Sequence, residues 1–153
     1  MANTYTKVYI QYIFAVQNRI SLINPRWEVE LYKYITGIVQ NQKHKLIAIN
    51  GMPDHIHVFV GMHTTQSMAE LMQDVKEFSS KWINKNVFTK GKFQWQDGYG
   101  AFSYSKSHID NVYKYIMNQK EHHKKKTFIE EYIEFLKKFE VPYDERYIFK
   151  PVE

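Results

Sequence analysis

The chain has 153 residues, which suits a single compact domain, and its hydrophobic content of 44% excludes an intrinsically disordered protein. It contains no cysteine, which excludes disulfide bonds and thiolate metal sites. The formal net charge of +5 favours anionic partners such as nucleic acid, although many other proteins are equally basic.

The first half of the chain alternates between strand and helix patterns. Apolar residues alternate over 8–14 and predict a strand. A proline that suits a first helical turn then opens a helix pattern over 25–38. Two more strands are predicted over 45–50 and 55–61, separated by the turn-forming residues 51–54.

Two helices of the second half begin at capping boxes, in which a hydroxyl and a glutamate bond to backbone N–H groups of the first turn. Ser67 with Glu70 starts one of these helices, and Thr127 with Glu130 starts the other. The apolar residues at helical spacing in the last helix are Ile129, Tyr132, Ile133, Leu136 and Phe139.

Between these helices, residues 93–104 are rich in aromatic side chains and predict a strand or a bent strand pair. Ser107 and Asp110 can cap a further helix. Residues 141–153 look irregular, so we expect a C-terminal tail on one domain that spans residues 1–153.

The resulting order is strand, helix, strand, strand, helix, strand, followed by C-terminal helices. This order predicts an α+β fold of the ferredoxin-like type, an antiparallel sheet with helices on one face. The open face of such a sheet commonly binds nucleic acid.

His55 and His57 form the most informative pair of the sequence. Alternate side chains of a strand lie on opposite faces, so both imidazoles are expected on one face while Ile56 points into the core. Two imidazoles on one rigid face can share a divalent metal ion. The pair alone does not define a reaction, since two surface histidines can alternate on a strand by chance.

A tyrosine-containing helix follows, and its residues fall on different faces. Ile109, Val112, Tyr113 and Ile116 share one stripe, which makes Tyr113 the better packing residue. Tyr115 lies to the side of the stripe, one turn from Gln119. Tyr115 is therefore the candidate nucleophile carried by the C-terminal helices, and Gln119 is a candidate third metal ligand.

A basic segment, residues 122–126, comes next in the sequence (HHKKK). It is either a solvated helix end or a patch that contacts phosphates. His122 lies on the side of Tyr115 and Gln119 and can touch the site, whereas a metal-ligand role for His122 or His123 is not favoured.

These segments together resemble the HUH single-tyrosine transposases of small bacterial insertion sequences, the TnpA type. The resemblance runs from about Tyr5 to Phe149. The matching segments are residues 50–57 (NGMPDHIH), 80–84 (SKWIN), 95–105 (WQDGYGAFSYS), 115–119 (YIMNQ) and 121–124 (EHHK).

The resemblance implies a specific chemistry. His55 and His57 would be metal ligands with Gln119 as the third, the ion would be Mg²⁺ or Mn²⁺, and Tyr115 would form a 5′-phosphotyrosine with single-stranded DNA. The resemblance also implies recognition of hairpin DNA ends and a homodimer, in which the tyrosine of one subunit can face the histidines of the other.

Three alternatives stay open on the sequence. A host-resident REP-associated tyrosine transposase would use the same chemistry on repeats that it does not carry. A non-catalytic module would bind single-stranded nucleic acid without cleavage. A metal hydrolase would use water in place of Tyr115. The sequence has neither a long apolar run nor a secretory signal pattern, so we expect a cytoplasmic protein without a membrane span.

Overall fold

The structure is a computed structural model that describes residues 4–144 and residue 148. Its strands are β1 (Tyr9–Ala15), β2 (Lys45–Met52), β3 (His55–Gly61) and β4 (Gly100–Tyr104). Its helices are α1 (Pro25–Asn41), α2 (Met68–Lys85), α3 (Ile109–Met117), α4 (Gln119–His122) and α5 (Phe128–Lys138), with short 3-10 turns η1 (Gln17–Arg19) and η2 (Lys106–His108).

The four strands form one antiparallel sheet in the order β2-β3-β1-β4. This is the ferredoxin-like order, so the α+β fold expected from the sequence is confirmed. Strand β3 is central and pairs with both β1 and β2, with Ile13 opposite His57 and Ala15 opposite His55. The segment of β3 that carries the histidines is therefore held on both sides.

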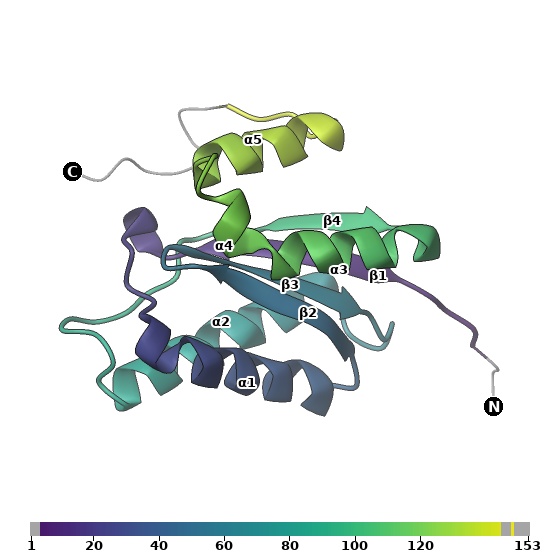
Figure 1. Cartoon of the computed structure of the whole chain (residues 1–153). Coiled ribbons are helices and arrows are strands. Elements are labelled where there is room, and N and C mark those ends of the chain that lie inside the picture. The colour runs from purple at the N-terminus through teal and green to yellow at the C-terminus, as the bar shows by residue number, and fades with distance from the viewer. Residues whose placement is uncertain (1–3, 145–147, 149–153) are drawn as a thin grey trace.

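Helices cover both faces of the sheet (Figure 1). Helices α1 and α2 lie on one face and bury the main apolar core with Ile56, Val58 and Val60 of β3. Helices α3, α4 and α5 lie on the other face, where Phe59 packs with Val112 and Ile116 of α3. The second face is thus not an open platform for nucleic acid, because the C-terminal helices cover it.

The helix starts follow the sequence at three positions. Asn24 and Ser67 accept hydrogen bonds from the first turns of α1 and α2, and the capping box of Thr127 with Glu130 is present at α5. The cap expected at Ser107 is wrong, because Ser107 lies in η2 and α3 begins without a side-chain cap.

The buried side of α5 also differs from the expected one. Phe128, Glu131, Phe135 and Leu136 are its buried residues, whereas Ile129 is only half-buried. Helix α5 lies on the sheet and forms a second apolar cluster with β1 and β4. The buried residues of this cluster are Ile13, Ala15, Phe102, Phe128, Phe135 and Leu136. This orientation carries Glu131 to the sheet.

The predicted tail falls largely outside the described residues, which include only 141–144 and 148 of its span. Among the residues that the structure describes, no helix has both the length and the apolar character that a membrane span requires.

Candidate active site

The candidate site begins with the two histidines of β3. His55 and His57 lie on the face opposite Ile56, as the alternation predicts, and neither side chain has solvent-exposed surface. Their ring centroids are 5.2 Å apart. The ring of Phe128 stacks on His55 at 4.0 Å and fixes the plane of that imidazole from the α5 side.

Hydrogen bonds to Nδ1 orient both imidazoles. Nδ1 of His55 lies 2.8 Å from a carboxylate oxygen of Asp54, and Nδ1 of His57 lies 2.7 Å from Oε1 of Gln11. Both partner atoms can only accept, so both Nδ1 atoms donate. Each Nε2 atom is consequently turned toward the interior of the site, the arrangement typical of histidine metal ligands.

The carboxylate of Glu131 lies where the two Nε2 atoms converge. Its Oε1 is 3.1 Å from Nε2 of His57 and 3.5 Å from Nε2 of His55. The sequence prediction did not include Glu131, because the expected apolar face of α5 was rotated away from it. The signal that could have identified Glu131 is its spacing, because it lies one helical turn from both Phe128 and Phe135. A carboxylate on the same helix face as two apolar rings is unusual unless it has a partner.

Both residues of the His122-His123 pair reach the site. Nε2 of His123 lies 3.0 Å from Oε1 of Glu131. His123 therefore belongs to the cluster, although the sequence did not favour a metal-ligand role for it. Nε2 of His122 is buried without a hydrogen-bond partner and lies 3.8 Å from Oε2 of Glu131. The expectation that His122 can touch the site is confirmed, because its ring centroid lies 4.9 Å from that of Tyr115.

Tyr115 and Gln119 meet the same carboxylate from the other side. The phenol of Tyr115 donates to Oε2 of Glu131, and Nε2 of Gln119 donates to that oxygen at 3.0 Å. Oε1 of Gln119 lies 3.2 Å from Nε2 of His55. The structure therefore brings together all four residues that the sequence singled out: His55, His57, Tyr115 and Gln119.

The packing role expected of Tyr113 is wrong. Tyr113 is 44% exposed, whereas Tyr115 is half-buried between α5 and the sheet. Helix α3 has one contact with the sheet through Val112 and Ile116 and a second with α5, and the second contact lies on the Tyr115 side. A stripe calculated from α3 alone could not include this second neighbour.

Two polar side chains fix the break between α3 and α4. The amide of Asn50 donates to the carbonyls of Ile116 and Met117 at 3.0 and 3.1 Å, which satisfies carbonyl groups at the end of α3. Nζ of Lys120 donates to Glu28 at 2.6 Å and to the carbonyl of Gly51 at 3.2 Å. The bonds that involve Asn50 and Gly51 tie the tyrosine-bearing segment to strand β2, and the bond to Glu28 ties it to helix α1.

The charges of the cluster are strongly coupled. Burial would raise the pKa of Glu131, but His57 and hydrogen bonds from the other imidazoles hold this pKa far below its ordinary value. Burial lowers the pKa of His57. Burial also acts to lower the pKa of His55, but hydrogen bonds to Asp54 and Glu131 outweigh it and raise that pKa.

Tyr115 keeps its proton in this arrangement. Burial raises the pKa of its phenol, and the neighbouring carboxylate of Glu131 raises it further. The phenol must therefore be separated from Glu131, or the carboxylate must be neutralised, before its oxygen can act as a nucleophile.

The residues present fit a metal ion. His55, His57, His123 and Glu131 each offer one ligand atom, and these atoms lie within 4.8 Å of one another. The outward hydrogen bonds from Nδ1 leave Nε2 of the two β3 histidines for coordination. A divalent cation would also compensate the charge of the buried carboxylate.

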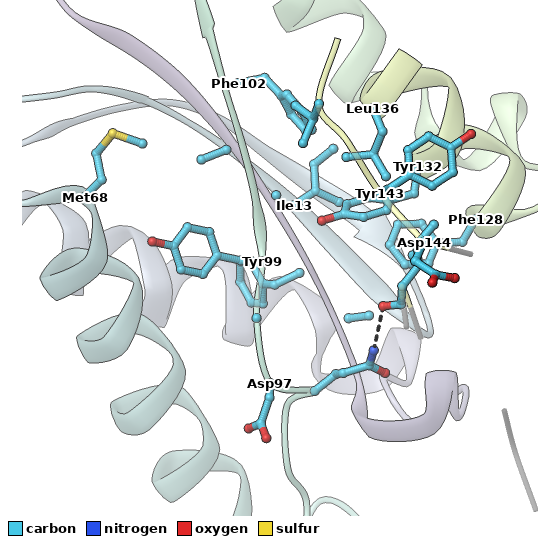
Figure 2. A pocket seen from close by; sticks show the side chains of 18 residues that line it. Ile13, Met68, Asp97, Tyr99, Phe102, Phe128, Tyr132, Leu136, Tyr143 and Asp144 are labelled. Atoms are coloured by element: carbon cyan, nitrogen blue, oxygen red, sulfur yellow. Dashed lines mark hydrogen bonds between the residues drawn. The ribbon is translucent and has the colours of Figure 1, made fainter. Parts of the chain in front are cut away.

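Two cavities flank α5. The smaller one, of about 340 Å³, is bordered by Tyr115, Gln11 and Phe135. The larger one, of about 640 Å³, lies between β4 and α5 and shares Phe128 with the histidine site. Figure 2 shows Tyr99 on one side of the larger cavity and Tyr132 with Phe128 on the other.

The carboxylates of Asp97 and Asp144 also line the larger cavity (Figure 2). Its lining therefore combines aromatic rings with negative charge, which favours apolar or amino-bearing groups and disfavours phosphates. A Cβ atom on Gly100 would lie 2.8 Å from the hydroxyl of Tyr132, so the glycine permits α5 to approach β4 this closely.

The chain is similar to known proteins in sequence and in fold. A family model described as "Transposase IS200 like" matches residues 4–119. The fold resembles that of a protein described as a transposase from Deinococcus radiodurans R1, with a TM-score of 0.62, 18% sequence identity, and coverage of 78% of this chain and 95% of that chain. No curated protein matches the sequence.

A second solved structure with a similar fold is that of a REP-associated tyrosine transposase bound to a REP hairpin. The TM-score is 0.57 and the sequence identity 14%, with coverage of 77% of this chain and 70% of that chain. The family match ends at Gln119, so His123 and Glu131 lie beyond it.

Proposed function

The chain belongs to the family of IS200-like transposases, and from this premise we propose that it cleaves and rejoins single-stranded DNA with Tyr115 as the nucleophile. The phenolic oxygen attacks phosphorus, the phenol loses its proton, and the 3′ oxygen leaves as a hydroxyl. The 5′ phosphate stays on the tyrosine until a 3′ hydroxyl attacks it, so the energy of the broken bond is conserved for rejoining.

One observation carries this proposal. The phenol of Tyr115 and the inward-facing nitrogens of His55 and His57 meet at a single carboxylate within one chain. A phosphate that replaced the contact between Tyr115 and Glu131 would touch the attacking oxygen and the histidine site together. This proximity supports nucleophilic attack in preference to passive packing of the tyrosine.

His55 and His57 would hold a divalent ion, Mg²⁺ or Mn²⁺, and Gln119 would contribute its Oε1, which already faces His55. The ion would supply positive charge to the scissile phosphate and stabilise the charge that develops during attack. Asp54 and Gln11 keep both imidazoles in the orientation that this requires.

The strand would approach from the smaller cavity. The imidazoles, Gln119 and Glu131 are almost completely buried, so a phosphodiester cannot reach them without local opening. Tyr115 is half-buried and borders that cavity together with Glu134 and Lys138. Displacement of the Tyr115 side chain from Glu131 would open the site and release the nucleophile in one motion.

The larger cavity would receive an unpaired base next to the scissile phosphate. Its rings of Tyr99 and Tyr132 offer stacking surfaces, and Phe128 connects it to His55. Asp97 and Asp144 would accept hydrogen bonds from the amino groups of a base while repelling a phosphate.

Recognition of hairpin DNA ends and assembly into a homodimer belong to the same proposal. The unpaired edges of the described sheet are β2 and β4, and either edge can join a second copy.

Because Tyr115 faces the histidines of its own chain, we propose a site completed in cis. A mixture of Tyr115→Phe and His57→Ala chains should then fail to form a covalent adduct, whereas a site completed in trans would regain activity.

Covalent capture tests the nucleophile directly. Single-stranded hairpin DNA labelled at its 3′ end is incubated with the protein and Mn²⁺ and separated on a denaturing gel. A 5′-phosphotyrosine retains the 3′ fragment, so the label should migrate with the protein. DNA labelled at its 5′ end should instead yield a shorter free fragment.

Tyr115→Phe should abolish the adduct and keep DNA binding, because only the attacking oxygen is removed. Tyr113→Phe is the matched control, since this neighbouring tyrosine is exposed on the same helix. A normal adduct yield from Tyr115→Phe would overturn the assignment. Cleavage without any adduct would favour a hydrolase in which water attacks.

A further inference from the structure

We propose that Glu131 and His123 are metal ligands in addition to the histidine pair of β3, and that they adapt the site to a transition-metal ion. Both residues lie beyond the part of the chain that the family model matches. This inference rests on the proposed function, because it concerns the metal site of the same reaction.

The geometry supplies the first argument. Oε1 of Glu131 lies 3.0 Å from Nε2 of His123, 3.1 Å from that of His57 and 3.5 Å from that of His55. Three imidazole nitrogens thus surround one carboxylate oxygen, and all four ligand atoms lie within 4.8 Å of one another. Such atoms repel one another unless protons or a cation lie between them.

The burial of Glu131 supplies the second argument. Its side chain is 1% exposed, and a buried carboxylate requires a compensating charge. No lysine or arginine within the described part of the chain pairs with it, and its charged partners are imidazoles alone. A divalent cation is the partner that would satisfy the carboxylate and the imidazoles together.

The donor set decides the class of metal. The imidazoles of His55 and His57 and the amide oxygen of Gln119 carry no negative charge. Glu131 adds one carboxylate to this buried set, and His123 adds a third imidazole. Imidazole nitrogens bind Co²⁺ and Zn²⁺ more tightly than Mn²⁺, Mn²⁺ accepts a mixture of imidazole and carboxylate ligands, and Mg²⁺ prefers oxygen ligands and retains several waters. We therefore expect Mn²⁺ and Co²⁺ to bind at least about tenfold more tightly than Mg²⁺.

Metal binding without DNA tests this assignment. Mn²⁺ affinity is measured on the full chain from the electron paramagnetic resonance signal of free Mn²⁺. Glu131→Gln should weaken binding at least about tenfold, and His123→Asn should weaken it measurably. Glu134→Gln and His108→Asn are the matched controls and should stay within about twofold of the wild type, because both residues lie outside the cluster.

The opposite result has a definite meaning. If Glu131 only neutralises the imidazoles and leaves when a cation binds, Glu131→Gln should bind Mn²⁺ as tightly as the wild type or more tightly. That outcome would overturn the assignment. Circular dichroism establishes that the variants fold.

A measurement on the wild type avoids any dependence on variants. Ligation through Glu131 should slow amide hydrogen exchange across α5 when Mn²⁺ is added, because the ion would hold that helix to the sheet. Unchanged or faster exchange in residues 128–138 would refute the proposal.

The two proposals fail separately. A wild-type protein that forms no DNA adduct, yet loses Mn²⁺ affinity on Glu131→Gln, would overturn the proposed reaction and support the ligand assignment. An adduct together with unchanged Mn²⁺ affinity of Glu131→Gln would support the reaction and overturn the ligand assignment.

Discussion

Gly51→Ala should destabilise the protein and displace His55. Gly51 pairs with Ile56 across the β2–β3 ladder. A Cβ atom at position 51 would lie 2.2 Å from the carbonyl oxygen of His55 and 2.9 Å from Cα of Ile56. Both neighbours are backbone atoms of a central strand and cannot rotate away, so the two strands must separate locally.

Overpacking of this kind costs about 1–3 kcal/mol, and the rigid backbone neighbours place the cost of Gly51→Ala at about 3 kcal/mol. For a domain of this size, that corresponds to a fall in melting temperature of roughly 6–12 °C. Mn²⁺ affinity should fall as well, because the strand that moves carries His55. Thermal melting followed by circular dichroism, with and without Mn²⁺, measures both effects.

Gly37→Ala is the matched control, because a Cβ atom at this position of α1 would meet no atom within 4 Å. Removal of a helical glycine should raise stability by roughly 0.5–1 kcal/mol. A melting temperature of Gly51→Ala within about 2 °C of the wild type would refute the reasoning, since it would mean that the ladder yields at little cost.

Two other predictions test the surroundings of the site. Gln11→Leu removes the acceptor of Nδ1 of His57, so Mn²⁺ affinity should fall about 10- to 100-fold; an unchanged titration would show that the packing of β3 alone orients the ring. Tyr99→Ala removes a ring from the larger cavity and should weaken binding of single-stranded DNA by about 1–3 kcal/mol, measured by fluorescence anisotropy, whereas Tyr5→Ala, 89% exposed and away from that cavity, should bind normally.

The sheet and the histidine pair were predictable because their signals are local. A period of two in the sequence determines which face His55 and His57 share, whatever packs on that face. The sequence order of strands and helices likewise indicated the ferredoxin-like arrangement, and the capping box of Thr127 with Glu130 marked the start of α5.

Glu131 and His123 were not predictable in the same way, because their role depends on how α5 packs. Ile129 and Phe139 suggested one buried side of α5, but the contact with Ile13 and Phe102 selects another side. The same reason applies to α3, where Tyr115 and not Tyr113 contacts α5. The proposal that Tyr115 is the nucleophile required the resemblance to a known family.

Strand β3 separates two layers with different tasks, and this limits how its sequence can vary. Ile56 packs in the core with α1 and α2, while the residues on either side of it belong to the site. An insertion or deletion between the histidines would reverse the side chains that follow and place an imidazole in an apolar layer. The volume available between α1 and α2 should therefore decide which side chains are tolerated at position 56. Substitutions of Ile56 that abolish function should do so by lowering the yield of folded protein and not by impairing strand transfer.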